Sequence, residues 1–300
     1  GMWEVRVSED TSEDASRVSR CLREWGVCVL RGVLPGETVV EARRCVLQWG
    51  QDNYPFPGWM QGVYPPHASF SLLQQQRELA YSLPVVAVSE APQLCALLRG
   101  VFQCQDDTVD GLCTTDFKWL RGVRHGEFTG VHMDCVYMGT DIPDLLTTWI
   151  PLGDTDEELG TLSFVPGSHR MKCLGKLHEE YGKQRVGADG TTSGWYTTRP
   201  ADIVEEFGEE AAKYQEKLEW CTPAMKTGDV CLFGLHTLHT TTPNQTHQLR
   251  ISVDCRWAPL ASGSQESATS SSSSGHSPST TTRSSIPSGM HEPLLGVDPP

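Results

Sequence analysis

Residues 117–138 read FKWLRGVRHGEFTGVHMDCVYM, and from this stretch onward the chain is a series of short β-rich runs. Turn sequences such as Pro166-Gly167-Ser168 separate the runs. Many short strands with turn-bounded spacing predict a β-sandwich or barrel. The expected strands are 117–123, 130–138, 145–150, 162–165, 230–235 and 249–257.

Helices are expected before these strands in the sequence. The apolar residues of the first helix recur at helical spacing: Val18, Cys21, Leu22 and Trp25. Gly26 then fits as its C-terminal stop, 27–30 is a short apolar strand, and Pro35 opens a second helix. A more polar insert occupies about 172–226, and its stretch 203–220 is expected to be helical. The chain is therefore predicted to be α+β, with a mainly β core.

The end of the chain has a different composition. From 261 to 290, 17 of 30 residues are Ser or Thr. So few apolar side chains do not offset the entropy lost on ordering, which predicts a disordered tail over 260–300. Residues 1–259 are expected to form a single domain, with its β core at about 117–258.

Charge and cysteine content exclude several classes of protein. The 300 residues carry a formal charge of −14, and an acidic surface repels nucleic acid and anionic lipid. No apolar run approaches the ~18 residues of a membrane span. Eleven cysteines without CxxC spacing are typical of reduced thiols.

Gly1-Met2-Trp3-Glu4 is unlike a signal peptide, and Val297-Asp298-Pro299-Pro300 is unlike a peroxisomal signal, so a cytoplasmic location is predicted.

His132-Met133-Asp134 is the first candidate metal-binding motif. Residues i and i+2 of a strand point to the same face, so an imidazole and a carboxylate could hold one metal. Taken alone, the motif is weak, because the chain contains three such pairs and a surface hydrogen-bonded pair is the simpler interpretation. The three are His125-Gly126-Glu127, His132-Met133-Asp134 and His178-Glu179-Glu180. Only His132 and Asp134 fall within an expected strand.

A second histidine would complete the two-histidine, one-carboxylate set of non-haem iron oxygenases. His236 and His239 both lie in an apolar stretch after Gly228, with opposite strand parity, so only one is expected to face inward. Arg250 follows eleven residues after His239. A hairpin turning at Pro243-Asn244 would place Arg250 on the strand beside His239, which favours His239. A buried guanidinium there could grip a carboxylate.

These residues and several flanking phrases resemble the phytanoyl-CoA dioxygenase family of iron and 2-oxoglutarate-dependent oxygenases. The resemblance covers about 15–258 and is closest to members without an assigned substrate. The phrases are Lys118-Trp119-Leu120-Arg121, Thr148-Trp149-Ile150-Pro151-Leu152-Gly153-Asp154, Val165-Pro166-Gly167-Ser168-His169 and Arg250-Ile251-Ser252.

By position, the resemblance implies that His132, Asp134 and His239 bind Fe(II) and act as the catalytic centre. Arg250 would then pair with the distal carboxylate of 2-oxoglutarate. Trp149 and Thr241 would also contact this cosubstrate. The fold that the resemblance implies is a double-stranded β-helix, or jelly roll, with flanking N-terminal helices and a helical insert.

The activity that the resemblance implies is O2-dependent hydroxylation of an unactivated C–H bond, with release of succinate and CO2. Halogenating relatives replace the carboxylate ligand with a small residue, and Asp134 is present here. Desaturation, epimerisation and cyclisation remain alternatives within the same chemistry. A metal- or ligand-binding protein without turnover is the alternative from another class.

The expected substrate is a small or lipid-like molecule, not a nucleic acid. Lys118, Arg121 and Arg124 form a local basic cluster in an acidic protein. A solvated strand edge is the simpler interpretation of this cluster. Contact with an acidic group of the substrate is the functional one.

Overall fold

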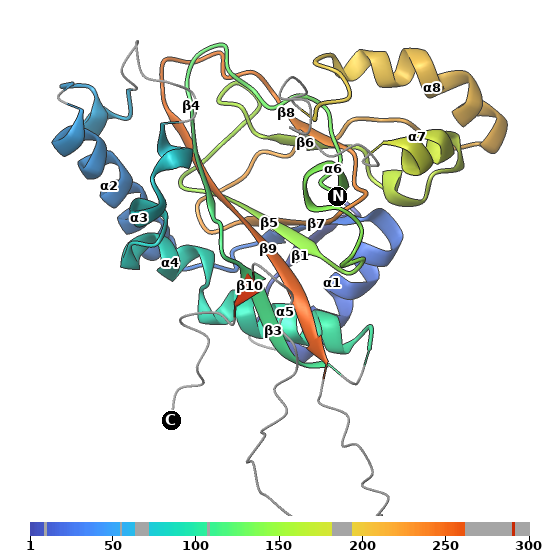
Figure 1. Ribbon diagram of the computed structural model, residues 1–300, viewed down its shortest axis with the longest axis horizontal. Helices are drawn as coiled ribbons and strands as arrows, with labels where there is room; N and C mark the ends of the chain where they lie inside the picture. The colour runs from blue at the N-terminus through green and yellow to red at the C-terminus, as the bar shows by residue number, and fades with distance from the viewer. Residues whose placement is uncertain are drawn as a thin grey trace, which may run out of the picture.

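Figure 1 shows the computed structural model, which describes residues 1–8, 11–54, 56–63, 72–106, 109–181, 194–261 and 290–291. The strands are β1 (Glu4–Arg6), β2 (Val27–Arg31), β3 (Val109–Thr115), β4 (Trp119–Val123), β5 (Leu146–Pro151), β6 (Leu162–Phe164), β7 (Val230–Gly234), β8 (His239–Thr241), β9 (Arg250–Ala261) and β10 (Met290–His291). The α-helices are α1 (Thr11–Trp25), α2 (Gly36–Asn53), α3 (Arg77–Ala80), α4 (Leu83–Ser89), α5 (Pro92–Gln103), α6 (Cys135–Met138), α7 (Gly175–Glu180) and α8 (Pro200–Tyr214). Short 3₁₀ helices are η1 (Trp59–Gln61), η2 (Leu73–Gln75), η3 (Ser168–Arg170) and η4 (Lys172–Leu174).

Two sheets form the predicted jelly-roll core. The large sheet has the order β1-β2-β7-β5-β9-β3-β10, and β4 also pairs with β9. The small sheet pairs β6 with β8 and is extended by isolated bridges from His132 to His239 and from Phe164 to Cys221. The mainly β core with flanking N-terminal helices is thus confirmed.

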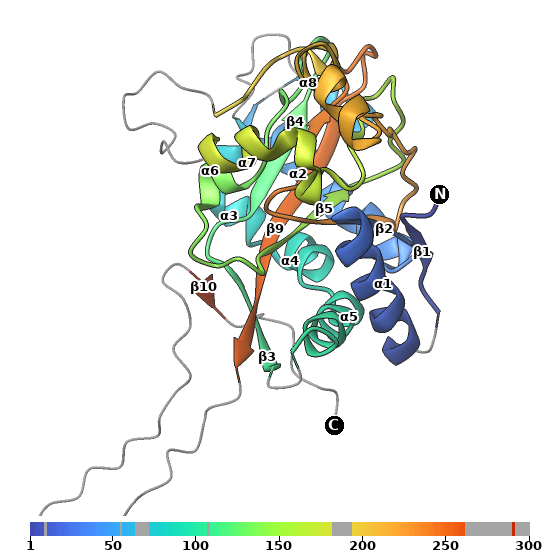
Figure 2. The ribbon, with the colours of Figure 1, turned by 90° about the vertical axis from the view of Figure 1, so that its right-hand side faces the viewer.

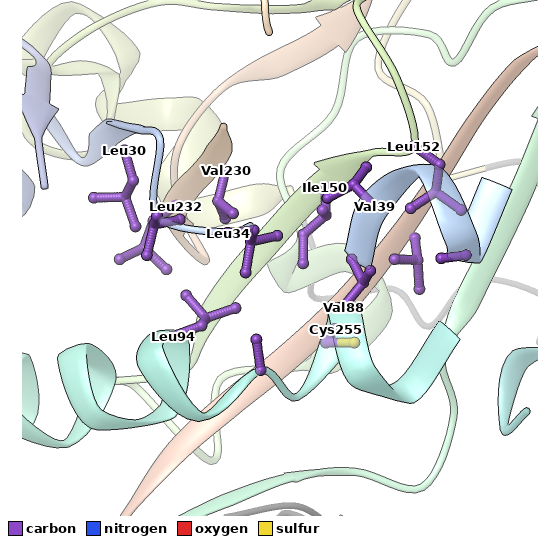
Figure 3. Packing of buried hydrophobic residues seen from close by; sticks show 14 of the residues in the cluster. Leu30, Leu34, Val39, Val88, Leu94, Ile150, Leu152, Val230, Leu232 and Cys255 are labelled. Carbon is purple, nitrogen blue, oxygen red and sulfur yellow. The ribbon is translucent and has the colours of Figure 1, made fainter. Parts of the chain in front are cut away.

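A large apolar cluster lies between the large sheet and the N-terminal helices. In Figure 3, Val39 of α2, Val88 of α4 and Leu94 of α5 point toward the sheet, where they meet Ile150 of β5 and Leu232 of β7. Each of these side chains is fully buried. Burying one such side chain contributes about 1.5–3 kcal/mol, so this cluster anchors the sheet that carries the site.

The first helix ends where the sequence predicted. The N–H of Gly26 bonds to the carbonyl of Leu22, and Gly26 has φ +70°, a conformation that favours glycine. A Cβ at this position would lie 2.4 Å from Nδ1 of His169. A larger residue at Gly26 would therefore strain the joint between α1 and β2.

One expected strand, 130–138, is wrong as a continuous strand. The run 130–138 forms only short bridges before its chain turns helical, because the carbonyl of Asp134 accepts N–H groups from Tyr137 and Met138. A short apolar run does not by itself separate strand from helix. The expected strand 230–235 is confirmed as β7, but a turn separates it from β8, so the argument from strand parity does not apply to His236 and His239.

The expected hairpin between His239 and Arg250 is also wrong. β8 belongs to the small sheet, whereas β9 pairs with β4 and places Arg250 opposite Val123. Asn244 directs the chain from one sheet to the other: its buried amide donates to the carbonyls of Val123 (2.9 Å) and Gln248 (2.8 Å). The turn is therefore a crossover between sheets.

The insert is helical over a shorter range than 203–220. Helix α8 ends at Tyr214, the capping residue Gln215 has φ 57°, and the carboxylate of Glu216 then accepts the N–H groups of Lys172 and Cys173. These bonds tie the following chain to η4. In Figures 1 and 2, α7 and α8 lie together at the end of the molecule opposite α5.

One described stretch, Leu83–Gln103, is apolar and long enough to cross a membrane by composition, with a mean hydropathy of 1.4. However, 67% of this window is buried within the protein. Glu90 and Pro92 divide it into α4 and α5, which pack in the main core. The stretch has the properties of core helices.

Part of the expected disordered tail is ordered. Strand β9 continues to Ala261, and β10 pairs with β3, with Met290 opposite Thr115 and His291 opposite Thr114. This short pairing extends the large sheet beyond the expected boundary at 259. The rest of the 260–300 prediction, from 262 to 289 and from 292, lies outside the described residues.

Candidate metal centre

His132, Asp134 and His239 come together at one end of the small sheet. The backbones of His132 and His239 exchange N–H···O bonds of 2.9 and 3.0 Å, which fixes the two side chains next to each other. Oδ1 of Asp134 lies 3.6 Å from Nε2 of His132 and 3.8 Å from Nε2 of His239. One ligand atom from each residue lies within 4.8 Å of the others, and all three residues are buried.

Backbone carbonyls orient both imidazoles. Nδ1 of His132 lies 2.8 Å from the carbonyl of Gly130, and Nδ1 of His239 lies 2.8 Å from that of Thr237. A carbonyl only accepts, so each Nδ1 carries the proton and each Nε2 keeps its lone pair. Burial and the neighbouring His132 lower the pKa of His239 to about 3. The His239 ring is therefore neutral at neutral pH.

The two oxygens of Asp134 have different surroundings. Oδ2 accepts hydrogen bonds from Oγ1 of Thr147 (2.5 Å) and Nη2 of Arg256 (3.0 Å). Oδ1 is buried and has no hydrogen-bond partner in the described part of the chain. Burial alone would raise the pKa of Asp134, but the neighbouring Arg256 guanidinium holds it well below its usual range. An ionised oxygen therefore faces two imidazole lone pairs, the donor set that suits non-haem Fe(II).

A small cavity of about 20 Å³ adjoins the three ligand groups. This volume accommodates an ion or one water molecule. The cavity is lined by Arg121, Thr129, His132, Asp134, Trp149, Leu162, Phe233, His239, Thr240, Thr241, Asp254 and Arg256. Trp149 and Thr241, both singled out in the sequence, are thus beside the triad.

Arg250 is a buried cation beside this cavity. Its side chain is 1% exposed, and its guanidinium lies 5.6 Å from the ring centre of Trp149. Nη1 donates to the hydroxyl of Ser252, whereas Nε and Nη2 have no hydrogen-bond partner among the described residues. Burial lowers the pKa of Arg250 to about 10. Buried charges are normally paired, so these free donors fit an anionic ligand such as a carboxylate.

The basic cluster predicted from the sequence is divided among separate sites. Lys118 is buried and pairs with Glu90 at 2.5 Å, so the interpretation as a solvated strand edge is wrong for this residue. Arg124 pairs with Glu127 on the partly exposed edge. Only Arg121 lines the triad cavity. The three side chains diverge because alternate residues of β4 and its approach face opposite sides of the sheet.

His236 lies apart from the triad, in the turn between β7 and β8. It lines a different cavity, together with Gly26 and His169. The preference for His239 thus agrees with the geometry, although the strand and hairpin arguments for it were wrong. The deciding contact is the backbone pairing of His239 with His132.

Sequence reasoning missed Arg256, Thr147 and Asp254. The signal was present as a period of two in β9, where Arg250, Ser252, Asp254 and Arg256 alternate with apolar residues. Thr147 shares a face of β5 with Trp149 in the same way. Neither pattern shows that Thr147 and Arg256 contact Asp134, because Asp134 belongs to a separate segment of the chain.

The fold is similar to those of several solved enzymes. The non-heme alpha ketoglutarate dependent carbocyclase SnoK from nogalamycin biosynthesis has a TM-score of 0.55 and 17% identity, covering 85% of this chain and 85% of that chain. The epimerase SnoN in complex with Fe3+, alpha ketoglutarate and nogalamycin RO has a TM-score of 0.54 and 18% identity, covering 83% and 84%. EctD from S. alaskensis with 2-oxoglutarate and 5-hydroxyectoine has a TM-score of 0.50 and 16% identity, covering 85% and 79%. At these identities the similarity shows the fold.

Sequence comparison identifies the family directly. No curated protein matches the chain. The family model for phytanoyl-CoA dioxygenase (PhyH) matches residues 22–252, which is most of the chain and includes every residue of the triad and Arg250. The chain belongs to the phytanoyl-CoA dioxygenase family.

Proposed function

We propose that this protein is an Fe(II)- and 2-oxoglutarate-dependent dioxygenase in which His132, Asp134 and His239 bind the metal. The observation that carries the proposal is the convergence of two oriented imidazole lone pairs and one unpaired carboxylate oxygen on a single buried point. Family membership and the shared fold support it. When bound, Fe(II), 2-oxoglutarate and O2 supply the oxidising chemistry, with succinate and CO2 as coproducts.

Arg250, Trp149 and Thr241 are proposed to hold 2-oxoglutarate. Two guanidinium nitrogens of Arg250 without partners among the described residues suit its distal carboxylate, and the indole of Trp149 both lines the triad cavity and lies 5.6 Å from the guanidinium of Arg250. The hydroxyl of Thr241 already accepts the N–H of Thr129 at 2.8 Å, which leaves its own proton free to donate.

Hydroxylation is the proposed reaction. Asp134 is present, so the metal keeps its carboxylate ligand, in contrast to halogenating relatives. Desaturation, epimerisation and cyclisation use the same metal and cosubstrate, and two enzymes of similar fold are an epimerase and a carbocyclase. The mass of the product distinguishes these outcomes: hydroxylation adds one oxygen, desaturation and ring closure each remove two hydrogens, and epimerisation leaves the mass unchanged.

The proposed substrate is a small or lipid-like molecule with an acidic group near Arg121. Nε of Arg121 bonds to Asp254 at 2.8 Å, and the side chain, 19% exposed, lines the cavity beside the triad. Charge reversal, Arg121→Glu, should raise the KM for an acidic substrate and leave the KM for 2-oxoglutarate unchanged. The matched variant Arg124→Glu, at the partly exposed edge, should leave both constants unchanged. Equal effects of Arg121→Glu on both KM values would contradict this role.

A first experiment separates an oxygenase from a binding protein without turnover. Anaerobic titration with Fe(II) and 2-oxoglutarate should give the weak visible charge-transfer band of an iron chelate. Succinate release after O2 is admitted would then establish turnover. Absence of the band, together with absence of thermal stabilisation by metal plus 2-oxoglutarate, would overturn the proposal. A band without succinate release under substrate screening would favour the binding protein.

A cytoplasmic location is also proposed. All eleven cysteines have free thiols, which is typical of proteins in a reducing compartment. Fractionation of cells expressing the tagged chain should recover it with cytosolic proteins. Recovery with secreted proteins would contradict the proposal.

A further inference from the structure

The carboxylate of Asp134 is held unequally by its neighbours. Oδ2 receives two hydrogen bonds, one from Thr147 of β5 and one from Arg256 of β9. Oδ1 receives none from the described residues and faces His132 and His239. The side chain is 1% exposed, so water does not equalise the two oxygens. One oxygen is thus committed to protein donors before any metal binds.

The donors to Oδ2 are themselves fixed. The guanidinium of Arg256 lies 4.3 Å from the ring centre of Trp119, on β4, and its Nη1 lies 3.9 Å from Oδ2 of Asp254. Asp254 also pairs with Arg121 at 2.8 Å. Thr147 and Arg256 lie opposite each other in the register of β5 and β9. The pairing of β5 with β9 therefore places both donors next to the same carboxylate oxygen.

We infer that Arg256 and Thr147 are positioning residues that keep Asp134 a one-oxygen metal ligand. A carboxylate near a cation binds through one or both of its oxygens. Two hydrogen bonds to Oδ2, one of them charge-assisted, oppose its transfer to the metal. The inference rests on the proposed function, because it assigns a role within the same metal site.

One-oxygen binding by Asp134 determines how many coordination positions of a bound metal stay free. Two imidazoles and one carboxylate oxygen leave three positions of an octahedral ion free. Bound 2-oxoglutarate would occupy two of them, and one would be left for O2. If Oδ2 also bound, that last position would be lost. Arg256 and Thr147 thus preserve the position on which O2 chemistry depends, at the cost of placing a cation near the metal.

Chemical rescue by formate tests the role without measuring turnover. In Asp134→Ala, the two donors remain and the tethered carboxylate is gone, so added formate can occupy its place. Mn(II) affinity, followed by electron paramagnetic resonance in chloride-free buffer, should fall in Asp134→Ala and recover with formate. In Asp134→Ala/Arg256→Met, formate should give no recovery. Asp134→Ala/Arg124→Met is the matched control and should recover fully.

Single variants give a second readout. Arg256→Met and Thr147→Val should each weaken Mn(II) binding by about 10- to 100-fold, the usual cost of losing a hydrogen bond to a metal ligand. Arg256→Lys should restore part of the affinity, because an ammonium can still donate to Oδ2. Circular dichroism checks that each variant is folded.

The outcomes separate the inference from the proposed function. Failure of the wild-type protein to bind Mn(II) or Fe(II) would overturn both. In another outcome, the wild type binds the metal while formate restores Mn(II) affinity to Asp134→Ala equally well with and without Arg256. That result would overturn the inference alone. Unchanged Mn(II) affinity in both single variants would also overturn it.

Discussion

The two faces of β9 differ sharply although they belong to one strand. Residues 251, 253, 255 and 257 are apolar and join the main core beneath the N-terminal helices. Residues 250, 252, 254 and 256 are polar or charged, and Asp254 and Arg256 line the cavity at the candidate metal centre. Both faces are almost completely buried. Burial alone therefore does not distinguish a stabilising face from a functional one.

The difference shows how this fold supports a charged site. The apolar face gains free energy from burial, whereas each buried charge on the other face costs free energy unless it is paired. Arg121, Asp254, Arg256 and Asp134 are paired in alternating order, which reduces that cost. Arg250 forms no ion pair of this kind with any residue that the structure describes. The strand thus places its stabilising residues and its proposed ligand-binding residues on opposite sides.

The largest effect is expected from Asp134→Ala on the site face. Loss of the carboxylate removes one of three metal ligands, so the Fe(II)–2-oxoglutarate band and succinate release should both be lost. Asp141→Ala, at an exposed acid nearby, is the control and should behave as wild type. Retention of the band in Asp134→Ala would mean that another group supplies the third ligand.

A charged pair on the apolar side gives the next largest effect. Lys118 and Glu90 are both fully buried there, and Lys118 lies 5.3 Å from the ring centre of Tyr81. Lys118→Met should destabilise the protein by about 3–5 kcal/mol, because Glu90 loses its counter-charge. Urea unfolding measures this loss. The double variant Lys118→Met/Glu90→Gln should be more stable than the single one, and equal stability would contradict the pairing argument.

The same pair predicts a pH dependence. Burial by itself would lower the pKa of Lys118, but Cys255 and Glu90 raise it above its ordinary value of 10.5. A cation with a raised folded-state pKa contributes stability fully below its unfolded pKa and loses it as pH rises through the folded one. The stability difference between wild type and Lys118→Met should therefore be constant near neutral pH and shrink above about pH 10.5.

Arg250→Met tests the ligand-binding side of β9. Hydrogen bonds to charged groups contribute about 1.5–3 kcal/mol, so the Kd for 2-oxoglutarate should rise by about 10- to 150-fold. Metal affinity without cosubstrate should change little, because the contacts of Arg250 within the described residues are with Ser252 and Trp149 and not with the triad. Calorimetric titration measures both constants. A larger loss of metal affinity than of 2-oxoglutarate affinity would contradict the assignment.

Ile251→Val, at the neighbouring position on the apolar face, should have the smallest effect. Removal of one buried methylene costs about 0.5–1.5 kcal/mol of stability. The Kd values for Fe(II) and 2-oxoglutarate should stay at wild-type levels, since Ile251 points to the main core. A change in either Kd larger than the stability loss would show that the two faces of β9 are not independent.

Much of the site was predictable because its residue types are restrictive. His132, Asp134, His239 and Arg250 were identified from motif, order and resemblance, and the structure brings them to one region. Their proposed roles in binding iron and cosubstrate stay predictions until the titrations above are made. The local conformation was less predictable: the apolar residues after Asp134 were expected in a strand and form a helical turn.

The amino-acid sequence by itself determined the class of fold, the identity of the ligand-type residues and the two-residue period that divides β9 into an apolar and a polar face. Tertiary structure alone decided how Asn244 leads the chain between sheets, and that Thr147 and Arg256 share one oxygen of Asp134. The physical reason is the range of the interactions. Periodicity and turn chemistry act between neighbours in sequence, whereas the partners of Asp134 are 13 and 122 residues away.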